Sequence, residues 1–277
     1  MAAIYEDKEF CCVARRDELG LTPIPGDVVY ILEYAGDCLR WGCLKRRGIM
    51  KFTSHCSAWR FGTDQRVLFN VLSISSASII PDYRIRFAPD KKIDFCVYLD
   101  PHHDPNDTNI ASTVDAVRAH LPGLSINPTD DLSLLSNPIA IPIETKRPGE
   151  GLDTANLQVA TFLTAHLTLL QRLLDAGASV PVQDGEKAPS VDDLGFLPGL
   201  IVQGNTWNFI AASRQDSRIV IWSETSLGST GDIFGIYQIV ASLQLLRQWI
   251  GTTYWPWLRR VTQRAATAAQ LRDGPAG

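Results

Sequence analysis

The chain has 277 residues, which is long enough for one large domain or two small ones with a sizeable core. Its 45% hydrophobic and 20% charged residues are typical of a soluble globular protein. A net charge of −4 excludes a chain-wide basic field that would attract nucleic acid, although a local cleft on an acidic protein can still be basic.

Cysteine usage and the start of the sequence indicate the compartment. The six cysteines form no CxxC pair, which argues against a structural zinc ribbon, and the start MAAIYEDKEF has no apolar signal region. We therefore expect reduced, mostly buried thiols. The most apolar long stretch, residues 233–250, is interrupted by three glutamines and Arg247. These features predict an intracellular protein, cytoplasmic or nuclear, with no membrane partner.

The first part of the chain offers few regular elements. Residues 1–50 form an N-terminal elaboration rich in cysteine, arginine and glycine. Residues 59–72 have apolar side chains at helical spacing and predict a helix, and SISSASIIP at 73–81 predicts a short strand. The β-branched and aromatic residues of KKIDFCVYLD, 91–100, predict a further strand. A turn-rich segment follows, with a short helix expected near 111–120.

The middle of the chain predicts a strand and a long helix. NPIAIPIETK, 137–146, is nearly continuous in apolar character, as in a strand that is covered on both faces. A helix is expected from Asp153 to about Leu174, with Leu157 on its apolar stripe and Gly177 after its end.

The last part predicts a hairpin around Gly204-Asn205, a third strand near 217–224, and a second long helix over 230–251. The tail 261–277 is expected to fray. Together the elements predict one α/β domain over residues 51–260.

A group of polar side chains is predicted where two strands and the long helix meet. Asp94 comes from one strand, Glu144 and Lys146 from the next, and Gln158 from the first turns of the helix. Side chains at i and i+2 of a strand share a face, so Glu144 and Lys146 point one way and Thr145 the other. Two carboxylates on adjacent strands favour Mg²⁺ or Mn²⁺, to which the backbone carbonyl of Thr145 could add a ligand. A lysine beside the metal can activate water for attack on a phosphodiester.

The same three charged residues have a structural interpretation. An E-x-K pair on an exposed strand is usually a surface ion pair of little energetic consequence. Here the pair ends a run too apolar for an exposed edge, and burying charges is costly unless they are paired or hold a metal. The residues alone leave both interpretations open.

Five segments resemble the fungal branch of the PD-(D/E)xK nuclease-like family over roughly residues 50–258: KKIDFCVYL, IPIETKRPG, LQVATF, LPGLIVQGNTWNFIAA and LGSTGDIFGIYQIVASLQLLRQW. The resemblance implies a restriction-endonuclease-like core, a central mixed sheet flanked by helices. It matches Asp94 to the motif acid, Glu144 and Lys146 to the ExK pair, and Gln158 to a glutamine on the helix after the motif. Residues 101–137 are then an insertion, and Asp64 is the one acid near the expected first helix.

Three hypotheses for function follow. The first is a nuclease that hydrolyses nucleic acid with Mg²⁺ or Mn²⁺. The second is a metal-independent enzyme of fungal secondary metabolism, in which Glu144 and Lys146 act as acid and base on a small organic substrate in a Trp- and Tyr-lined pocket. The third is a non-catalytic relative that keeps the motif as a buried ion pair.

Other residues are candidates for contacts with substrate or with a second copy. Arg147 and Trp207 are candidates for substrate binding, although Trp207 belongs to a C-terminal group of tryptophans that is also interpreted as core or interface. Arg46 and Arg47 of the basic run RWGCLKRRGIMKF are further candidates, and the alternative for this run is a solvated loop. YWPW at 254–257 is interpreted either as core or as an exposed patch for recognition or homodimer formation. The histidines of PHHDPND are expected in a solvated turn rather than on a metal.

Overall fold

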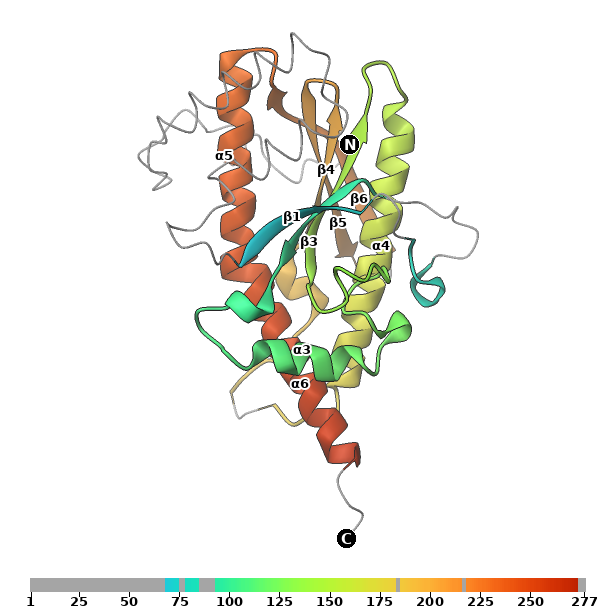
Figure 1. Cartoon of the computed structure of the whole chain (residues 1–277), viewed down its shortest axis with the longest axis vertical. Helices are drawn as coiled ribbons and strands as arrows, with labels where there is room; N and C mark the ends of the chain where they lie inside the picture. Colours follow the sequence, from blue (N-terminus) through green and yellow to red (C-terminus); the bar gives the residue numbers. More distant parts are fainter. Residues whose placement is uncertain (1–67, 75–77, 85–92, 183–184, 216–217, 274–277) are drawn as a thin grey trace.

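A six-stranded mixed sheet forms the centre of the computed structural model, which describes residues 68–74, 78–84, 93–182, 185–215 and 218–273 (Figure 1). The strands lie side by side in chain order: β1 (Phe69–Ser73), β2 (Phe95–Leu99), β3 (Ile139–Lys146), β4 (Leu197–Gln203), β5 (Thr206–Gln215) and β6 (Arg218–Ser229). Among these strands β3 and β4 are the parallel pair, and the other neighbours are antiparallel. A parallel pair needs a crossover, which α4 (Leu152–Ala176) provides.

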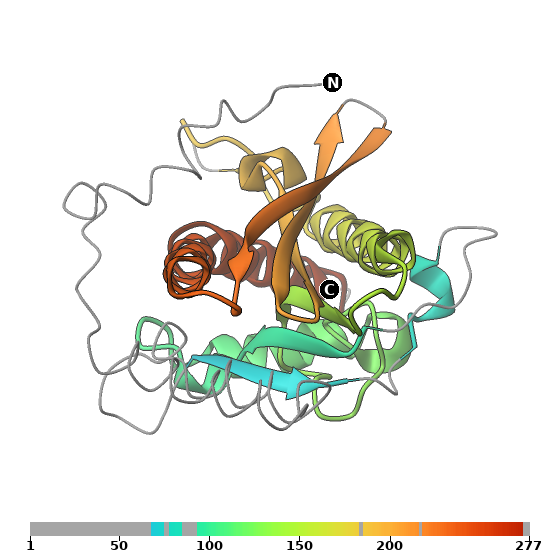
Figure 2. The same ribbon diagram turned by 90° about the horizontal axis from the view of Figure 1, so that it is seen from above.

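Helices cover the sheet on two sides. Figure 2 shows α4 and α5 (Ile233–Trp249) on opposite sides of the strands, with α4 against β3 to β5 and α5 against β6. A π-helical turn, Ile250–Tyr254, joins α5 to α6 (Trp255–Asp273), which packs on α3 (Ile110–Arg118) and α4. Short 3₁₀ turns lie at Pro81–Tyr83, Pro101–His103, Pro122–Leu124 and Val191–Leu194.

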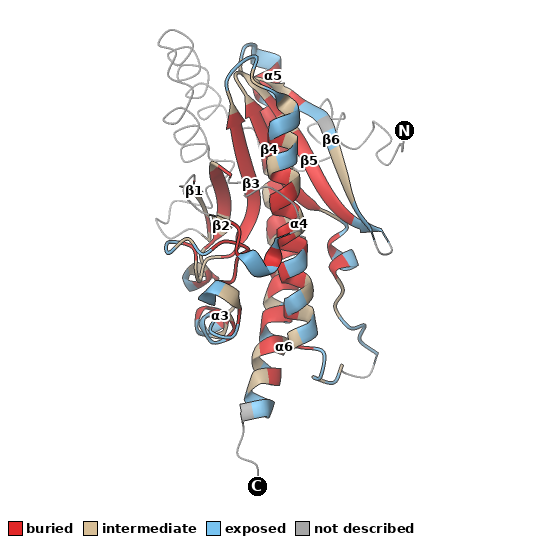
Figure 3. Cartoon of the chain, turned by 90° about the vertical axis from the view of Figure 1, so that its right-hand side faces the viewer, coloured by how far each residue is buried: buried red, intermediate tan, exposed pale blue. Residues whose placement is uncertain are grey.

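The burial of β3 confirms the prediction of a strand covered on both faces. Every residue from Ile139 to Thr145 is buried, and Lys146 is partly buried (Figure 3). The β4–β5 hairpin is also confirmed, and Gly204 at its turn has φ +57°, a conformation that glycine adopts without steric cost. The predicted helix of residues 153–174 matches α4, but Leu157 is 50% exposed and lies off the buried stripe.

The predicted fraying of the C-terminal tail is wrong for residues 261–273, and residues 274–277 lie outside the described part of the chain. Helix α6 continues to Asp273, and Val261, Ala265 and Ala268 are buried along it. Pro256 lies in its first turn. A proline ring clashes with the carbonyl group four residues earlier in a continuous helix, and proline has no backbone N–H to donate. The wider π turn directly before it accommodates this defect without ending the helix.

The predicted helix over 59–72 is also wrong where it can be checked. Residues 69–72 form most of β1, which pairs with β2, and residues 59–67 lie outside the described part of the chain. The five-residue match of β1 to β2 outweighs the helical spacing of the apolar side chains. Of the strand expected at 73–81, the described residues show the end of β1 and a single bridge between Ile79 and Thr129, while residues 75–77 lie outside the described part.

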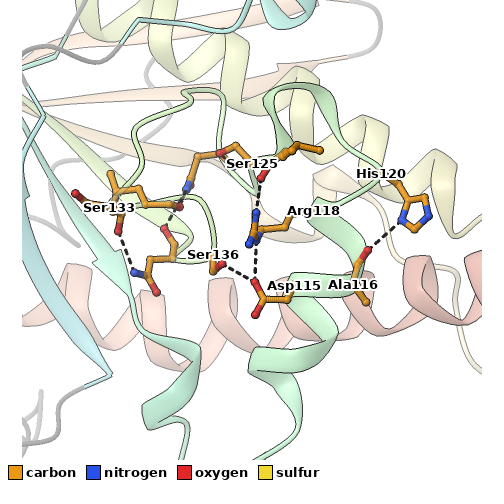
Figure 4. Close-up of polar contacts among 11 residues, drawn as sticks. Asp115, Ala116, Arg118, His120, Ser125, Ser133 and Ser136 are labelled. Carbon is orange, nitrogen blue, oxygen red and sulfur yellow. Dashed lines mark hydrogen bonds and ion pairs between the residues drawn. The ribbon is translucent and has the colours of Figure 1, made fainter.

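Segment 101–137, predicted as an insertion, is held by its own polar contacts (Figure 4). The Arg118 side chain donates to Asp115 Oδ1 at 2.8 Å and to the carbonyl oxygen of Leu124 at 2.9 Å. The fully buried Asn127 side chain donates to the Asn137 carbonyl and accepts from the N–H of Ile139. Asn127 therefore fixes the point at which β3 begins.

The aromatic segment YWPW belongs to the core. Trp255 and Trp257 are 3% and 6% exposed, and Tyr254 is fully buried, so the alternative of an exposed recognition or homodimer patch is wrong for these side chains. The Tyr254 hydroxyl donates to the carbonyl of Ile139 and lies 3.0 Å from His166 Nε2. These contacts tie the π turn to α4 and to the start of β3.

None of the helices within the described residues is long and apolar enough to cross a membrane.

Candidate active site

The register between β2 and β3 brings the predicted acidic residues together. Phe95 pairs with Ile143, so Asp94, directly before β2, lies beside Glu144 and Thr145 near the end of β3. The strand predicted for 91–100 therefore begins later than expected, and Asp94 lies in a bend at its entrance. The structure thus brings residues 94, 144 and 146 to one end of β3, and their predicted roles in a site stay predictions.

Glu144, Lys146 and Gln158 form a hydrogen-bonded row. Lys146 Nζ donates to Glu144 Oε1 at 2.6 Å and to Gln158 Oε1 at 2.8 Å. The first contact shows that the two side chains share a face of β3, as the two-residue spacing predicts. Gln158 lies in the second turn of α4, which follows β3 after a short loop, so the crossover helix brings it back over the strand.

The Glu144 carboxyl group is in an unfavourable place for a charge. Burial raises its pKa to about 7; the hydrogen bond from Lys146 opposes the rise, and the Asp94 carboxylate adds to it. The Gln158 side chain also lies close enough to lower the pKa of this carboxyl group, but the buried Oε2 of Glu144, a residue that is 2% exposed, has no hydrogen-bond partner among the described residues. A buried carboxylate oxygen without a partner costs free energy, so it marks the place where a cation would be favourable.

Asp94 is held from two directions. Its Oδ2 accepts the backbone N–H of Thr145 at 3.1 Å and also the Thr145 hydroxyl. Its backbone carbonyl accepts the N–H of Ile74, just after β1, at 2.9 Å. The Asp94 side chain thus continues the β2–β3 ladder beyond the last backbone pair.

The carbonyl of Thr145 points to the same side as Asp94. The carbonyl of Lys146 accepts the N–H of Gly204 at 3.0 Å and therefore faces β4. Backbone groups of successive strand residues point to opposite sides, so the N–H and carbonyl of Thr145 both face β2, where Asp94 takes the N–H. The Thr145 carbonyl thus faces the same side as Asp94, and its role as a ligand stays a prediction.

These groups fit a hard divalent cation. Two carboxylates and a backbone carbonyl are the oxygen ligands that Mg²⁺ and Mn²⁺ prefer, and Mg²⁺ usually keeps several waters beside one or two carboxylates. Within the described part of the chain no three His, Cys, Asp or Glu side chains gather as a ready-made metal cluster. The fit therefore rests on Asp94, the unpartnered Oε2 of Glu144, and Thr145.

Three connecting segments contact one another beside the carboxyl end of β3. A Cβ atom added to Gly204 would lie 2.8 Å from Pro148 Cγ, so the β4–β5 turn touches the loop between β3 and α4. The side chain of Gln203 donates to the carbonyl of Glu150 in the same loop. The Asn205 carbonyl accepts the N–H of Thr230 at 2.8 Å, which adds the β6–α5 connection.

The residues predicted to bind substrate have different outcomes. Arg147 is exposed in the loop after β3, with its Nε 3.7 Å from Glu150 Oε1, so a role in substrate binding stays a prediction. Trp207 is 2% exposed in the core, so its position gives no support to the prediction that it binds substrate. Arg46 and Arg47, like Asp64, lie outside the described residues.

The PHHDPND segment is more ordered than the solvated turn expected from its sequence. His103 Nδ1 lies 2.8 Å from Asp100 Oδ2 in a 3₁₀ turn. Asp104 is 5% exposed, and its Oδ2 accepts from Trp255 Nε1 at 2.9 Å and from Arg259 at 3.1 Å. Asp104 therefore anchors this turn to α6, a contact with no local signal in the sequence.

Two surface cavities lie away from this group. The first, about 300 Å³, is lined by the end of α4 with Pro189 and Arg264; the second, about 260 Å³, lies between α4 and residues Val191, Arg214 and Ile219. Neither includes Asp94, Glu144 or Lys146. These two cavities therefore give no support to the Trp- and Tyr-lined pocket of the small-molecule hypothesis.

Comparison with known proteins agrees with this geometry. The family model described as the PD-(D/E)XK nuclease superfamily matches residues 2–255. Comparisons with curated proteins and with solved structures gave no match. Assignment to the fungal branch stays a prediction. A match over most of the chain, with a mixed sheet carrying the Asp94, Glu144 and Lys146 group, shows that the protein belongs to the PD-(D/E)XK nuclease superfamily.

Proposed function

We propose that the protein hydrolyses phosphodiester bonds of nucleic acid with the help of Mg²⁺ or Mn²⁺. The observation that supports this most is the buried, unpartnered Oε2 of Glu144 beside Asp94 and Lys146. An ion pair kept for structure alone has no need for a buried carboxylate oxygen without a donor. Membership of a nuclease superfamily favours the same activity.

Each residue has a role that follows from its contacts. Asp94, Glu144 and the carbonyl of Thr145 would hold the cation, which when bound neutralises phosphate charge and acidifies water. The Lys146 ammonium group has three N–H donors, of which Glu144 and Gln158 take two. No acceptor among the described residues takes the third, which would then serve a phosphate oxygen or the attacking water. Gln158 fixes the direction of this donor from α4.

The proposal is tested by cleavage of single- and double-stranded DNA and RNA in Mg²⁺ or Mn²⁺, with and without a chelator. Cleavage is expected to need the cation and to fall by about 10²-fold or more in D94N, E144Q and K146M, because each removes a ligand or the charge next to the phosphate. Asp192→Asn, an exposed acid on a distant 3₁₀ turn, is the matched control and should keep wild-type activity. Cleavage that is unchanged in E144Q or K146M would reject the proposal.

The raised pKa of Glu144 supports a second candidate, metal-independent acid–base chemistry on a small organic substrate. A carboxyl group that titrates near pH 7 can donate and accept a proton at neutral pH, and Lys146 Nζ lies 2.6 Å away to stabilise the charged form. The chelator separates the candidates, because activity of this second kind would persist without a divalent cation.

A further inference from the structure

We propose that the Thr145 hydroxyl is a positioning group that orients the Asp94 carboxylate towards the cation. This role is distinct from that of the Thr145 carbonyl, and it rests on the proposed metal-dependent function. The residue between the two members of the ExK pair has its side chain on the opposite face of β3 from Glu144 and Lys146. Strand alternation alone would therefore give the Thr145 side chain no part in the site.

The contacts of Thr145 show otherwise. The residue is 7% exposed, and its hydroxyl donates to Asp94 Oδ2, the same oxygen that accepts its own backbone N–H at 3.1 Å. Two donors from one residue fix both the position and the rotation of the carboxylate. Among the described residues, both bonds to the Asp94 side chain fall on Oδ2, which leaves Oδ1 as the oxygen for a ligand bond.

Asp94 needs such a constraint because of its place in the chain. It precedes the first residue of β2 and lies in a bend, so the sheet ladder does not fix its side chain. Its backbone carbonyl is held by Ile74, but rotation about the side-chain bonds is restricted mainly by Thr145. Groups that orient a metal ligand typically change metal affinity by about 10- to 100-fold when they are removed.

Two substitutions separate the hydroxyl from the shape of the side chain. Thr145→Val keeps the β-branched shape and the backbone N–H but removes the hydroxyl donor, whereas Thr145→Ser keeps the hydroxyl. Thr262→Val is the matched control, because Thr262 is 1% exposed and its hydroxyl donates only within α6, to the Leu258 carbonyl. Binding of Mn²⁺ to each full-length variant is measured by calorimetry, and cleavage is measured as a function of Mn²⁺ concentration.

Thr145→Val is expected to bind Mn²⁺ about 10-fold more weakly than the wild type, while Thr145→Ser and Thr262→Val stay within about threefold of it. The kcat of Thr145→Val should recover at saturating Mn²⁺, because a high concentration of the ion compensates for a weaker affinity. A merely structural defect would not respond to the cation. Equal affinities of Thr145→Val and Thr145→Ser, with a wild type that binds, would overturn this inference alone. A wild type that binds no Mn²⁺ would overturn the proposed function and this inference with it.

Discussion

Lys146 is the residue on which both the stability and the chemistry of the site depend. Within the described part of the chain, its ammonium group is the one cationic group that pairs with the buried Glu144 carboxylate, at 2.6 Å, and the lysine side chain is itself only 17% exposed. Removing one member of a buried pair leaves an uncompensated charge, which is more costly than removing both. Stability and activity should therefore respond differently to single and double substitutions here.

Lys146→Met is expected to lower the free energy of unfolding by about 3 kcal/mol at pH 8, because the Glu144 carboxylate loses its partner. The double variant Glu144→Gln with Lys146→Met should regain most of that stability and none of the cleavage activity. Urea unfolding of both variants measures the difference. A double variant as unstable as the single one would mean that the unpaired Glu144 carboxylate is not the cause of the lost stability.

At the scale of single residues, the positions of the charged residues were predicted better from the sequence than the contacts that these residues make. Spacing and burial arguments placed Glu144 and Lys146 on one face and brought Asp94 to them, because strand periodicity is a local rule. The hydroxyl contact of Thr145 depends on the pairing of β2 with β3, and the burial of Trp207 depends on the pairing of β5 with β6. Such contacts between strands cannot be predicted from local spacing. The positions of the acids could therefore be predicted from the sequence, and the residues that contact them could not.

At the scale of elements, the approach of α4 to β4 sets the position of Gln158. A Cβ atom added to Gly199 of β4 would lie 2.5 Å from Val159 Cγ1 and 3.0 Å from Ile210 Cγ2. Only a residue without a side chain lets the helix come so close to the strand. Val159 is adjacent to Gln158, so the distance between helix and strand is transmitted directly to the partner of Lys146.

Gly199→Ala is expected to destabilise the protein by about 1–3 kcal/mol, because the added methyl group overpacks the contact with Val159. Adding Val159→Ala should restore part of the loss by vacating the position of Cγ1. Gly251→Ala is the control, since a Cβ atom there would be no closer than 3.8 Å to Phe69. Thermal unfolding compares the three, and a Gly199→Ala protein as stable as the control would show that the contact relaxes without cost.

The elements that the sequence predicted well are those with strong local signals. The apolar run of β3, the leucine-rich pattern of α4 and the Gly204-Asn205 turn each gave the right element. The errors were β1 and α6. The first takes its conformation from pairing with β2, and the second keeps its helix through a proline by means of a π turn. Both outcomes depend on tertiary contacts that outweigh local propensity.

At the scale of the whole molecule, two buried titratable groups give opposite dependences of stability on pH. Burial raises the pKa of Glu144 from 4.5 to about 7 and lowers that of His166 from 6.5 to about 4. Between pH 4.5 and 7 the folded state binds the Glu144 proton, so this group makes stability fall as pH rises. Between pH 4 and 6.5 the unfolded state binds the His166 proton, so that group makes stability rise with pH.

In the metal-free protein these two contributions, each roughly 3 kcal/mol, should largely cancel between pH 4.5 and 6.5. Glu144→Gln should expose the histidine contribution, so that its stability falls as the pH is lowered from 6.5 to 4. His166→Leu should show the reverse, with stability falling as the pH is raised from 4.5 to 7. Urea unfolding in the presence of a chelator gives the slopes, and parallel slopes in the two variants would contradict both assignments.

The most direct test of the central claim is anomalous diffraction from crystals of the wild-type protein grown with Mn²⁺. We predict a manganese peak about 2.0–2.6 Å from oxygen atoms of both Asp94 and Glu144, with Lys146 next to it. No peak at that place, with Glu144 bonded to Lys146 alone at a saturating concentration of the ion, would contradict the claim that these carboxylates hold a divalent cation.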